Sequence, residues 1–294
     1  MPLPDRFLSS LLLRASGKMI LIDCGEGTQL PVKTAGWGFV SIEAILLTHC
    51  HADHIAGLPG LLLAMGNSGR TAPVSIYGPP GAAEAVKGLT VIAKALPFEL
   101  CVKELPDNCQ SGMTIGELTV SSLPVEHTLP CLAYSVELKR SGKFDTEKAE
   151  KNGVPKRFWS LLQKGLTVCG DGIMYEPSMV TGRARKGLKL VYCTDTRPSK
   201  SLEAFVSNAD LLVCEGMYGS DDFKEKAISK KHMLFSEAAE LAQKSGCREL
   251  WLTHYSPQLK TPEAFLERAK EIFVNTRLGH DLMKATLRFE NDPE

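Results

Sequence analysis

Metal-ligand side chains are concentrated between residues 49 and 54, where the sequence reads His49-Cys50-His51-Ala52-Asp53-His54. Three imidazoles and one carboxylate within six residues cannot all reach one cation from a short loop. In an extended backbone His49 and His51 point to the same side, whereas the turn that follows aims Asp53 and His54 elsewhere. Two neighbouring cations satisfy this pattern, and imidazole combined with carboxylate suits zinc or manganese.

Other residues of the same chemical types stand at the ends of apolar runs further along the chain. These are His127, Asp195 and His254. Because sites in open sheets form at the carboxyl ends of strands, we expect them to join the histidine motif. A carboxylate at Asp195 could bridge two cations about 3.5–4 Å apart, a spacing that suits phosphate-ester displacement. His280 lies far from these strand ends in the sequence, and we interpret it as structural.

The elements that must position these residues are short apolar runs that alternate with helical stretches. Strands are expected over residues 19–23, 44–48, 74–77, 118–125, 132–138, 188–194, 211–214 and 250–253. Helices are expected over residues 82–94, 202–208, 235–244 and 262–275. Many strands with helices between them indicate a layered α/β protein.

Charge is distributed unevenly, although the chain has 34 basic and 34 acidic residues. Residues 139–189 hold twelve Lys and Arg against five Asp and Glu, so this segment is +7 and the rest is −7. The segment is rich in Gly and Pro and weak in apolar periodicity, which is typical of an insertion or arm. It is either a solvated loop or a surface that contacts a phosphate backbone.

Composition excludes several classes of protein. A hydrophobic fraction of 44% with no net charge argues against disorder. No run approaches the roughly 18 apolar residues of a membrane span, and no secretory leader is recognisable, so we expect a cytoplasmic protein without a membrane partner. Nine cysteines without a Cys-x-x-Cys pair favour reduced, mostly buried thiols over disulfides or a cysteine zinc site.

These motifs together resemble the ribonuclease Z family of the metallo-β-lactamase superfamily. Beside the histidine motif, the similar segments are Asp23-Cys24-Gly25-Glu26-Gly27-Thr28-Gln29, Leu58-Pro59-Gly60-Leu61, Gly69-Arg70, Ile76-Tyr77-Gly78-Pro79, Thr194-Asp195-Thr196-Arg197-Pro198 and Leu252-Thr253-His254-Tyr255-Ser256-Pro257. The resemblance implies a four-layer αββα metallo-β-lactamase sandwich over residues 1–294, with a tRNA-binding arm inserted at about 139–189. Family members begin with an apolar strand, whereas this chain starts at Pro2-Leu3-Pro4-Asp5-Arg6. An N-terminal strand is therefore expected to be missing, either because the true start lies upstream or because the protein lacks an edge strand.

The resemblance also implies a role for each candidate site residue. Two Zn²⁺ per chain, with Mn²⁺ or Co²⁺ as possible substitutes, would be held by His49, His51 and His127, by Asp53, His54 and His254, and by Asp195 as a bridge. Asp53 would also orient or deprotonate the attacking water. Glu215 would keep His232 charged, and this pair would protonate the leaving 3′-oxygen. Asp23 would support the histidine loop through hydrogen bonds, and Cys50 would serve packing.

The implied activity is hydrolytic removal of the 3′ trailer of precursor tRNA, after the discriminator nucleotide and leaving a 3′-hydroxyl. The implied assembly is a homodimer, with phosphate contacts from the arm at Lys156, Arg157 and Lys164. One alternative is a phosphodiesterase of the same fold that acts on small phosphodiesters. A second is an RNA-binding or assembly subunit that kept the fold but lost the chemistry.

Overall fold

The computed structural model describes residue 3 and residues 6–290 of the chain. The chain forms two compact units. Residues up to 137 and residues 189–286 form the first unit, and residues 138–188 with the described residues 287–290 form the second. The boundaries fall within two long strands, β8 (Cys131–Arg140) and β11 (Arg185–Cys193). All candidate metal ligands belong to the first unit.

The first sheet of the first unit has five strands in the order β1-β2-β3-β4-β5. β1 and β2 form an antiparallel hairpin, and β2 to β5 run parallel. The hairpin turn consists of Ser16 and Gly17, whose φ angles of 48° and 78° match the twist of a two-residue hairpin. The strands are β1 (Leu11–Ala15), β2 (Lys18–Ile22), β3 (Ile42–Leu46), β4 (Val74–Gly78) and β5 (Leu100–Glu104).

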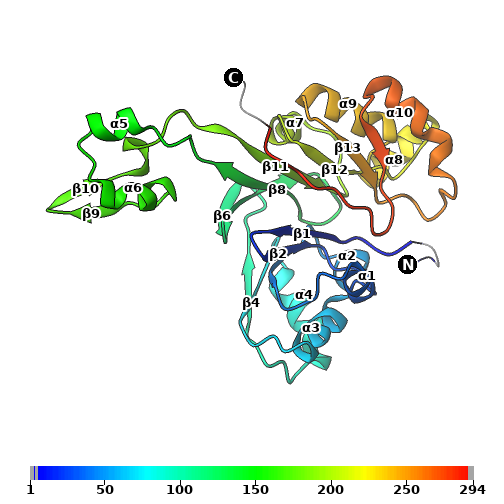
Figure 1. Cartoon of the computed structure of the whole chain (residues 1–294). Helices are drawn as coiled ribbons and strands as arrows, with labels where there is room; N and C mark the ends of the chain where they lie inside the picture. The colour runs from blue at the N-terminus through cyan, green and yellow to red at the C-terminus, as the bar shows by residue number, and fades with distance from the viewer. Residues whose placement is uncertain (1–2, 4–5, 291–294) are drawn as a thin grey trace. The chain divides into compact units, whose positions relative to one another are not determined.

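Helices cover one face of this sheet (Figure 1). Their apolar sides pack on the buried runs of β2, β3 and β4, and this packing forms one of the hydrophobic cores. The helices are α1 (Gln29–Ala35), α2 (Ala52–Ile55), α3 (Leu58–Asn67) and α4 (Ala82–Leu89), and α4 continues into the 3₁₀ turn η1 (Thr90–Ile92). Continuous apolar runs such as that of β3 are expected of parallel strands, which have both faces covered.

The second sheet has seven strands in the order β14-β13-β12-β11-β8-β7-β6. β11 to β14 run parallel, and β6 and β7 are antiparallel. The strands other than β8 and β11 are β6 (Ser111–Ile115), β7 (Leu118–Val125), β12 (Leu211–Glu215), β13 (Leu250–Thr253) and β14 (Thr276–Leu278). The helical elements of this half are α7 (Lys200–Val206), η3 (Asp221–Phe223), α8 (Lys224–Lys230), α9 (Phe235–Ser245), η4 (Pro262–Phe265) and α10 (Leu266–Ile272).

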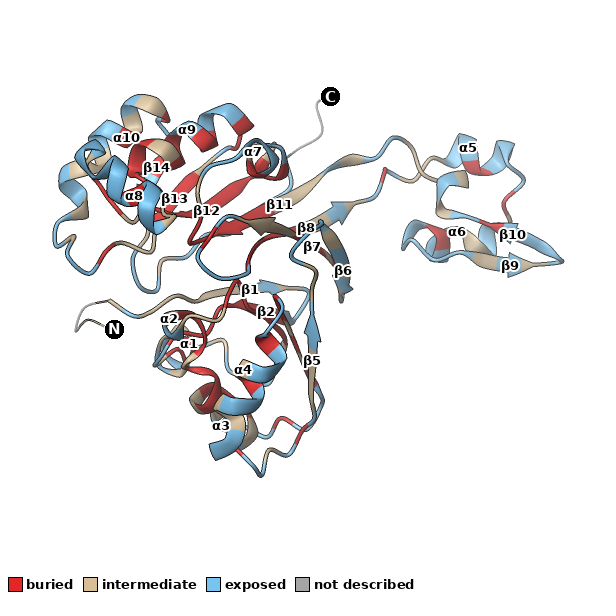
Figure 2. Ribbon diagram, turned by 180° about the vertical axis from the view of Figure 1, so that it is seen from behind, coloured by how far each residue is buried: buried red, intermediate tan, exposed pale blue. Residues whose placement is uncertain are grey.

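The two sheets of the first unit face each other, and buried strand residues lie between outer helices (Figures 1 and 2). The Tyr134 hydroxyl on β8 donates to the carbonyl of Leu47, at 2.8 Å, and the amide of Leu132 donates to the carbonyl of Thr48, at 2.9 Å. β8 is thereby joined to the segment that follows β3 and leads into the histidine motif. The predicted order of helices, sheet, sheet and helices is confirmed.

The second unit has its own small core. Its elements are α5 (Thr146–Lys151), α6 (Lys156–Gln163), β9 (Val168–Gly170), β10 (Ile173–Tyr175) and the 3₁₀ turn η2 (Pro177–Met179). Ala149, Leu162 and Tyr175 are buried together, with Phe158 and Trp159 packed against them.

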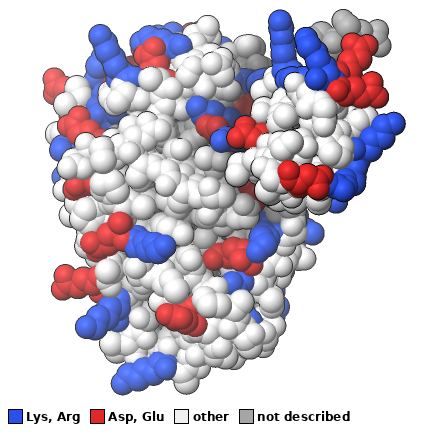
Figure 3. Space-filling model, turned by 90° about the vertical axis from the view of Figure 1, so that its left-hand side faces the viewer, with Lys and Arg blue, Asp and Glu red and all other residues white. Residues whose placement is uncertain are grey.

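Basic and acidic side chains are interspersed on the face of the molecule in Figure 3. A polyanion at that face would therefore meet individual basic side chains rather than a uniform charge.

All eight predicted strands are present, and the four predicted helices correspond to α4 with η1, α7, α9, and η4 with α10. The prediction missed the short edge strands β1, β5, β6 and β14 and the hairpin of β9 and β10. It also missed α1, α2, α3, α5, α6 and α8. The expectation of a missing N-terminal strand was based on residues 2–6. Of these, only Leu3 and Arg6 are described, so the expectation stays a prediction. None of the helices in the described part has the length and hydropathy that a bilayer crossing requires.

Candidate metal centre and active site

The histidine motif changes backbone conformation halfway along its length. His51, the residue before α2, has extended backbone angles, with φ −70° and ψ 151°. Asp53 and His54 already lie in the single turn of α2. This change aims the first two histidines and the last two ligand-type residues at two different groups of side chains, as the spacing predicted.

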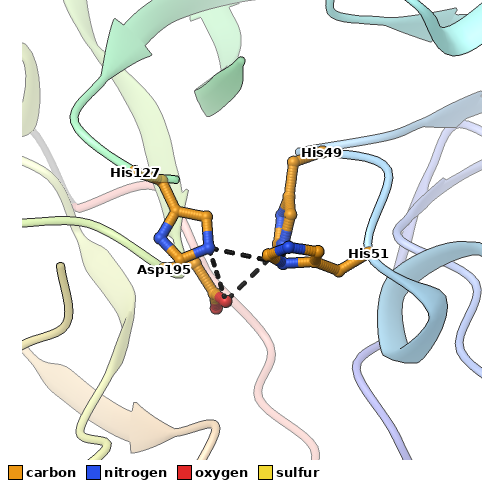
Figure 4. Close-up of side chains that lie close together, drawn as sticks. All are labelled: His49, His51, His127 and Asp195. Carbon is orange, nitrogen blue, oxygen red and sulfur yellow. Dashed lines mark hydrogen bonds and ion pairs between the residues drawn. The ribbon is translucent and has the colours of Figure 1, made fainter. Parts of the chain in front are cut away.

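The first group consists of His49, His51, His127 and Asp195, whose nearest ligand atoms all lie within 4.8 Å of one another. His49 Nε2 is 2.8 Å from His51 Nδ1, and His127 Nε2 is 3.4 Å from the same atom. Asp195 Oδ2 lies 3.6 Å from His49 Nε2 and 3.5 Å from His127 Nε2. Figure 4 shows the four side chains converging from β3, β7 and β11.

The second group consists of Asp53, His54 and His254. His54 Nε2 and His254 Nε2 face each other at 3.1 Å, and Asp53 Oδ2 lies 3.4 Å from His254 Nε2. The other oxygen of Asp195, Oδ1, is 3.6 Å from His54 Nε2 and 3.2 Å from His254 Nδ1. Asp195 thus turns one oxygen toward each group, which is the arrangement expected of a bridging carboxylate.

The hydrogen bonds within the protein do not satisfy every buried polar atom of this cluster. Among the described residues, the buried atoms Asp195 Oδ1 and His254 Nδ1 have no hydrogen-bond partner, although they lie 3.2 Å from each other. Buried polar atoms without a partner are rare in folded proteins. Imidazole nitrogens and carboxylate oxygens that converge in this way form a donor set that fits zinc. The residues present therefore fit the metal that the sequence predicted.

Burial and neighbouring charges set the ionisation of the cluster. Burial lowers the pKa of His49 to about 2 and that of His127 to about 4, so both rings are neutral near pH 7 and offer lone pairs. Burial also opposes charge on His254, but Asp195 and a hydrogen bond with Asp53 outweigh it and raise the pKa of His254 to about 9. A cation that enters the second group must therefore displace a proton from His254.

Three polar residues at strand ends adopt left-handed backbone conformations. Asp23 after β2, Asp195 after β11 and His254 after β13 have φ angles of 59°, 32° and 54°. Positive φ is uncommon for residues other than glycine, and such conformations gather at functional sites where the surroundings enforce them. Here each one turns a side chain at the end of a strand into the cluster or its immediate support.

Asp23 makes the contacts that its expected supporting role requires. Its side chain is fully buried and accepts hydrogen bonds from the Thr48 amide, at 2.8 Å, and from the Thr48 hydroxyl. Asp23 belongs to neither ligand group. Cys50, the thiol within the histidine motif, packs against the core of the first sheet as expected. In the described part of the chain all nine cysteines are free thiols.

Glu215 and His232 lie together at this cluster, and His232 forms a third group of possible metal ligands with Asp195 and His254. Glu215 at the end of β12 is fully buried, and its Oε2 lies 2.9 Å from His232 Nδ1. Its other oxygen accepts the amide of Thr196 at 2.5 Å, directly after Asp195. The His232 ring lies 5.3 Å from the His127 ring and 6.1 Å from the His254 ring, between centroids. Burial raises the pKa of Glu215, although His232 opposes this effect.

Arg197 joins two loops of the site, and the sequence analysis assigned it no role. Its guanidinium forms a bidentate ion pair with Glu237, with distances of 2.7 Å and 2.5 Å, and also donates to the backbone carbonyl of His232. Arg197 was visible in the motif Thr194-Asp195-Thr196-Arg197-Pro198, but nothing in the motif indicates its partners. It connects the loop that carries Asp195 to the loop that carries His232.

The cluster opens into a cavity of about 340 Å³. Besides ligand-type residues and His232, this cavity is lined by Thr128, Met217, Tyr218, Lys226 and Lys230. The two lysines were missed because α8 was not predicted, and single lysines on a polar helix carry no sequence signal.

The three arm residues singled out in the sequence are exposed in the second unit, where Lys156 lies 5.6 Å from the Trp159 ring and Arg157 pairs with Asp171. Lys164 directly follows α6. His280 is exposed and belongs to neither ligand group.

A buried pair of histidine and aspartate groups at the strand ends of two helix-covered sheets defines a protein of the metallo-β-lactamase fold. Human tRNase Z, short form, has this fold with a TM-score of 0.68 and 23% identity, over 96% of this chain and 93% of that one. YhfI from Bacillus subtilis, a metallo-β-lactamase fold protein, has a TM-score of 0.66 and 22% identity, over 95% and 91% of the two chains.

The family follows from a closer relative. Ribonuclease Z from Clostridium acetobutylicum is 50% identical over 99% of this chain and 96% of its own length. The chain therefore belongs to the ribonuclease Z family. The family of the anti-Pycsar protein Apyc1 also matches, over residues 4–141.

Proposed function

We propose that this protein is an endoribonuclease that removes the 3′ trailer of precursor tRNA, cutting after the discriminator nucleotide and leaving a 3′-hydroxyl. The observation that carries the proposal is the position of Asp195, which turns one carboxylate oxygen to each of two histidine groups. His232, held by Glu215, lines the same cavity. This combination fits hydrolysis of a phosphodiester whose leaving group needs a proton.

The proposed cofactor is two Zn²⁺ per chain, with Mn²⁺ or Co²⁺ as substitutes. The first ion would be held by His49, His51 and His127, the second by Asp53, His54 and His254, and Asp195 would contact both. When bound, the metal pair would stabilise the negative charge that develops on the phosphate and ease deprotonation of the attacking water. The support for this ligand set is the convergence of its atoms and the buried atoms without hydrogen-bond partners.

The protein's own side chains would manage the two proton transfers. Asp53 is about one-third exposed to the cavity, and its neighbours His254 and His54 outweigh burial and hold the pKa of its carboxyl well below the usual range. It would orient the attacking water as an ionised acceptor. On the opposite side of the phosphate, His232 would donate a proton to the leaving 3′-oxygen. Glu215 would keep the ring in position by its contact at Nδ1, which leaves Nε2 for the substrate.

The basic segment 139–189 would serve as the inserted tRNA-binding arm. Lys156, Arg157 and Lys164 are its proposed phosphate contacts, which would recognise the shape of the RNA without reading bases. The pair of Arg157 with Asp171, both exposed, leaves the guanidinium accessible to a competing phosphate. The family resemblance further supports a homodimer that works in the cytoplasm.

Cleavage-site mapping tests the proposal. The substrate is an end-labelled precursor tRNA with a 3′ trailer, incubated with the purified protein with and without chelator. Asp195→Ala is the control variant, because it removes the only carboxylate that faces both histidine groups among the described residues. We expect one chelator-sensitive cut directly after the discriminator nucleotide, which the variant does not make.

Two results would contradict the proposal. One is hydrolysis of bis(p-nitrophenyl) phosphate without any cut in precursor tRNA, which would favour an enzyme for small phosphodiesters. The other is tight tRNA binding without hydrolysis of either substrate by the zinc-loaded protein, which would favour a subunit that has lost its chemistry.

A further inference from the structure

Helix α8 brings two lysines to the metal-site cavity that the proposed reaction does not use. Lys226 and Lys230 line the same cavity as Asp53, Asp195 and His232. They are four residues apart on one helix, so they lie on the same helical face, one turn apart. Both side chains belong to exposed residues. The chain continues from α8 through Lys231 directly to His232.

The charges of these two lysines are not neutralised by carboxylates. Among the residues that the structure describes, neither forms an ion pair, and Lys226 donates to the neutral side-chain amide of Gln258, whose oxygen lies at 3.5 Å. The neighbouring Lys231 differs, because its ammonium lies 3.7 Å from Glu126 and donates to the carbonyl of His127. Two cationic groups at the cavity thus keep their charge available for a ligand.

Aromatic rings hold Lys226 at the cavity. Its ammonium lies 5.2 Å from the centroid of the Tyr218 ring and 5.7 Å from that of Phe223. The two rings are stacked on each other at 5.6 Å, and Tyr218 is nearly buried. Cation–π contacts attract an ammonium without neutralising it, so it can still bind an anion. The ring pair therefore restrains a side chain that would otherwise move freely in solvent.

We propose that Lys226 and Lys230 form a subsite for backbone phosphates of the RNA on the leaving-group side of the cut, at the 3′ end of the tRNA product. This inference rests on the proposed function. The assignment to the leaving-group side rests on His232. This residue lies two positions after the end of α8 and is the proposed proton donor to the leaving 3′-oxygen. The nucleotide that carries this oxygen is the last one of the product. Lysine binds a phosphate as a point charge, so the subsite is indifferent to sequence.

The test compares Lys226→Gln, Lys230→Gln and the double variant with the wild-type zinc enzyme. Lys270→Gln is the matched control, because Lys270 lies on α10 in an exposed pair with Glu267. Three quantities are measured: KM and kcat for precursor tRNA, direct binding of mature tRNA by fluorescence anisotropy, and hydrolysis of bis(p-nitrophenyl) phosphate, which has no flanking nucleotides.

For the double variant we expect KM for the precursor and Kd for mature tRNA to rise together by about 10-fold, with kcat within about two-fold. The slope of log Kd against log salt should fall in magnitude by about 1.4, which corresponds to two phosphate contacts on a single strand. Hydrolysis of the small diester should stay unchanged. Lys226→Arg with Lys230→Arg should restore both KM and Kd, since charge rather than shape is required.

Several outcomes would overturn the inference. Unchanged KM and Kd would show that the lysines are solvated surface charges. A raised KM with an unchanged Kd for mature tRNA would move the contact to the trailer. Loss of diester hydrolysis in both the Gln and the Arg variants would make the lysines part of the support of the metal site. If the wild-type enzyme binds tRNA but does not cut the precursor, the proposed function fails, and the binding measurement still decides on the subsite.

Discussion

Asp23 fixes the orientation of the His54 ring: the carboxylate oxygen Oδ2 lies 2.8 Å from His54 Nδ1, and both side chains are fully buried. A carboxylate can only accept at this contact, so Nδ1 carries the hydrogen. The other ring nitrogen, Nε2, is therefore left with its lone pair and faces His254. Support of this kind determines which nitrogen of a histidine can bind a metal.

Replacing Asp23 by asparagine is expected to weaken zinc binding by about 10- to 100-fold, because the single acceptor oxygen of an amide cannot serve both the Thr48 amide and His54 Nδ1. Zinc affinity is measured by competition with a chromogenic chelator. Asp171→Asn, an exposed carboxylate of the second unit, is the control and should leave the affinity unchanged. An unaltered affinity in Asp23→Asn would refute this account of the ring orientation.

Replacing Arg197 by lysine is expected to lower kcat on precursor tRNA by about 10-fold or more at nearly constant KM, because an ammonium cannot hold both Glu237 and the His232 carbonyl. Single-turnover cleavage measures the effect, and metal content should be unchanged. Arg268→Lys is the comparison, since that arginine makes an exposed ion pair with Glu271. Equal rates for both variants would show that the contact does not position His232.

Replacing His232 by alanine should lower the hydrolysis rate only of substrates whose leaving group needs a proton. We expect cleavage of precursor tRNA to fall by about 100-fold or more, the usual effect of losing a general acid. Hydrolysis of bis(p-nitrophenyl) phosphate should change little, because p-nitrophenolate leaves without a proton. The two rates are measured on the same preparation. Parallel losses on both substrates would instead indicate damage to the metal site.

Replacing Gly57 by alanine is expected to destabilise the first unit by about 3 kcal/mol, because overpacking a close contact forces the backbone to shift. A Cβ there would lie 2.0 Å from the carbonyl oxygen of Gly25. Gly88 in α4 is the matched position, since nothing lies within 4 Å of its Cβ site. Gly88→Ala should stabilise by up to about 1 kcal/mol through helix propensity. Denaturant unfolding of the zinc-loaded proteins measures both, and similar values would contradict the steric argument.

Removing zinc is expected to lower Tm, because the metal binds the folded cluster and not the unfolded chain. With free zinc about 1,000-fold above Kd, the stabilisation amounts to about 4 kcal/mol. Differential scanning calorimetry with chelator and with added zinc measures this shift. In Asp195→Ala the zinc-dependent shift should shrink, because the carboxylate facing both groups is gone. Identical melting curves with and without zinc would contradict a metal site in this cluster.

The ligand types, their order and the strands they follow could be predicted from the residues alone. Clustered histidines are rare enough to stand out, and long apolar runs such as β7, β8 and β11 predict strands from local periodicity alone. The pair of Glu215 and His232 was predicted by resemblance, although 17 residues separate them. Several short edge strands were missed because they have at most five residues, and α3 was missed because its proline and glycines disfavour a helix.

The way in which these residues meet depends on the packing of distant segments of the chain. His54 and His254 are 200 residues apart in sequence, yet their Nε2 atoms face each other at 3.1 Å. The division of the two Asp195 oxygens between two groups, and the link from Arg197 to His232, depend on how β11, β12 and β13 align. A role for the lysines of α8 could be inferred only from their position beside the cavity. Such relationships arise from packing between distant segments, and neither local propensity nor the spacing of residues encodes that packing.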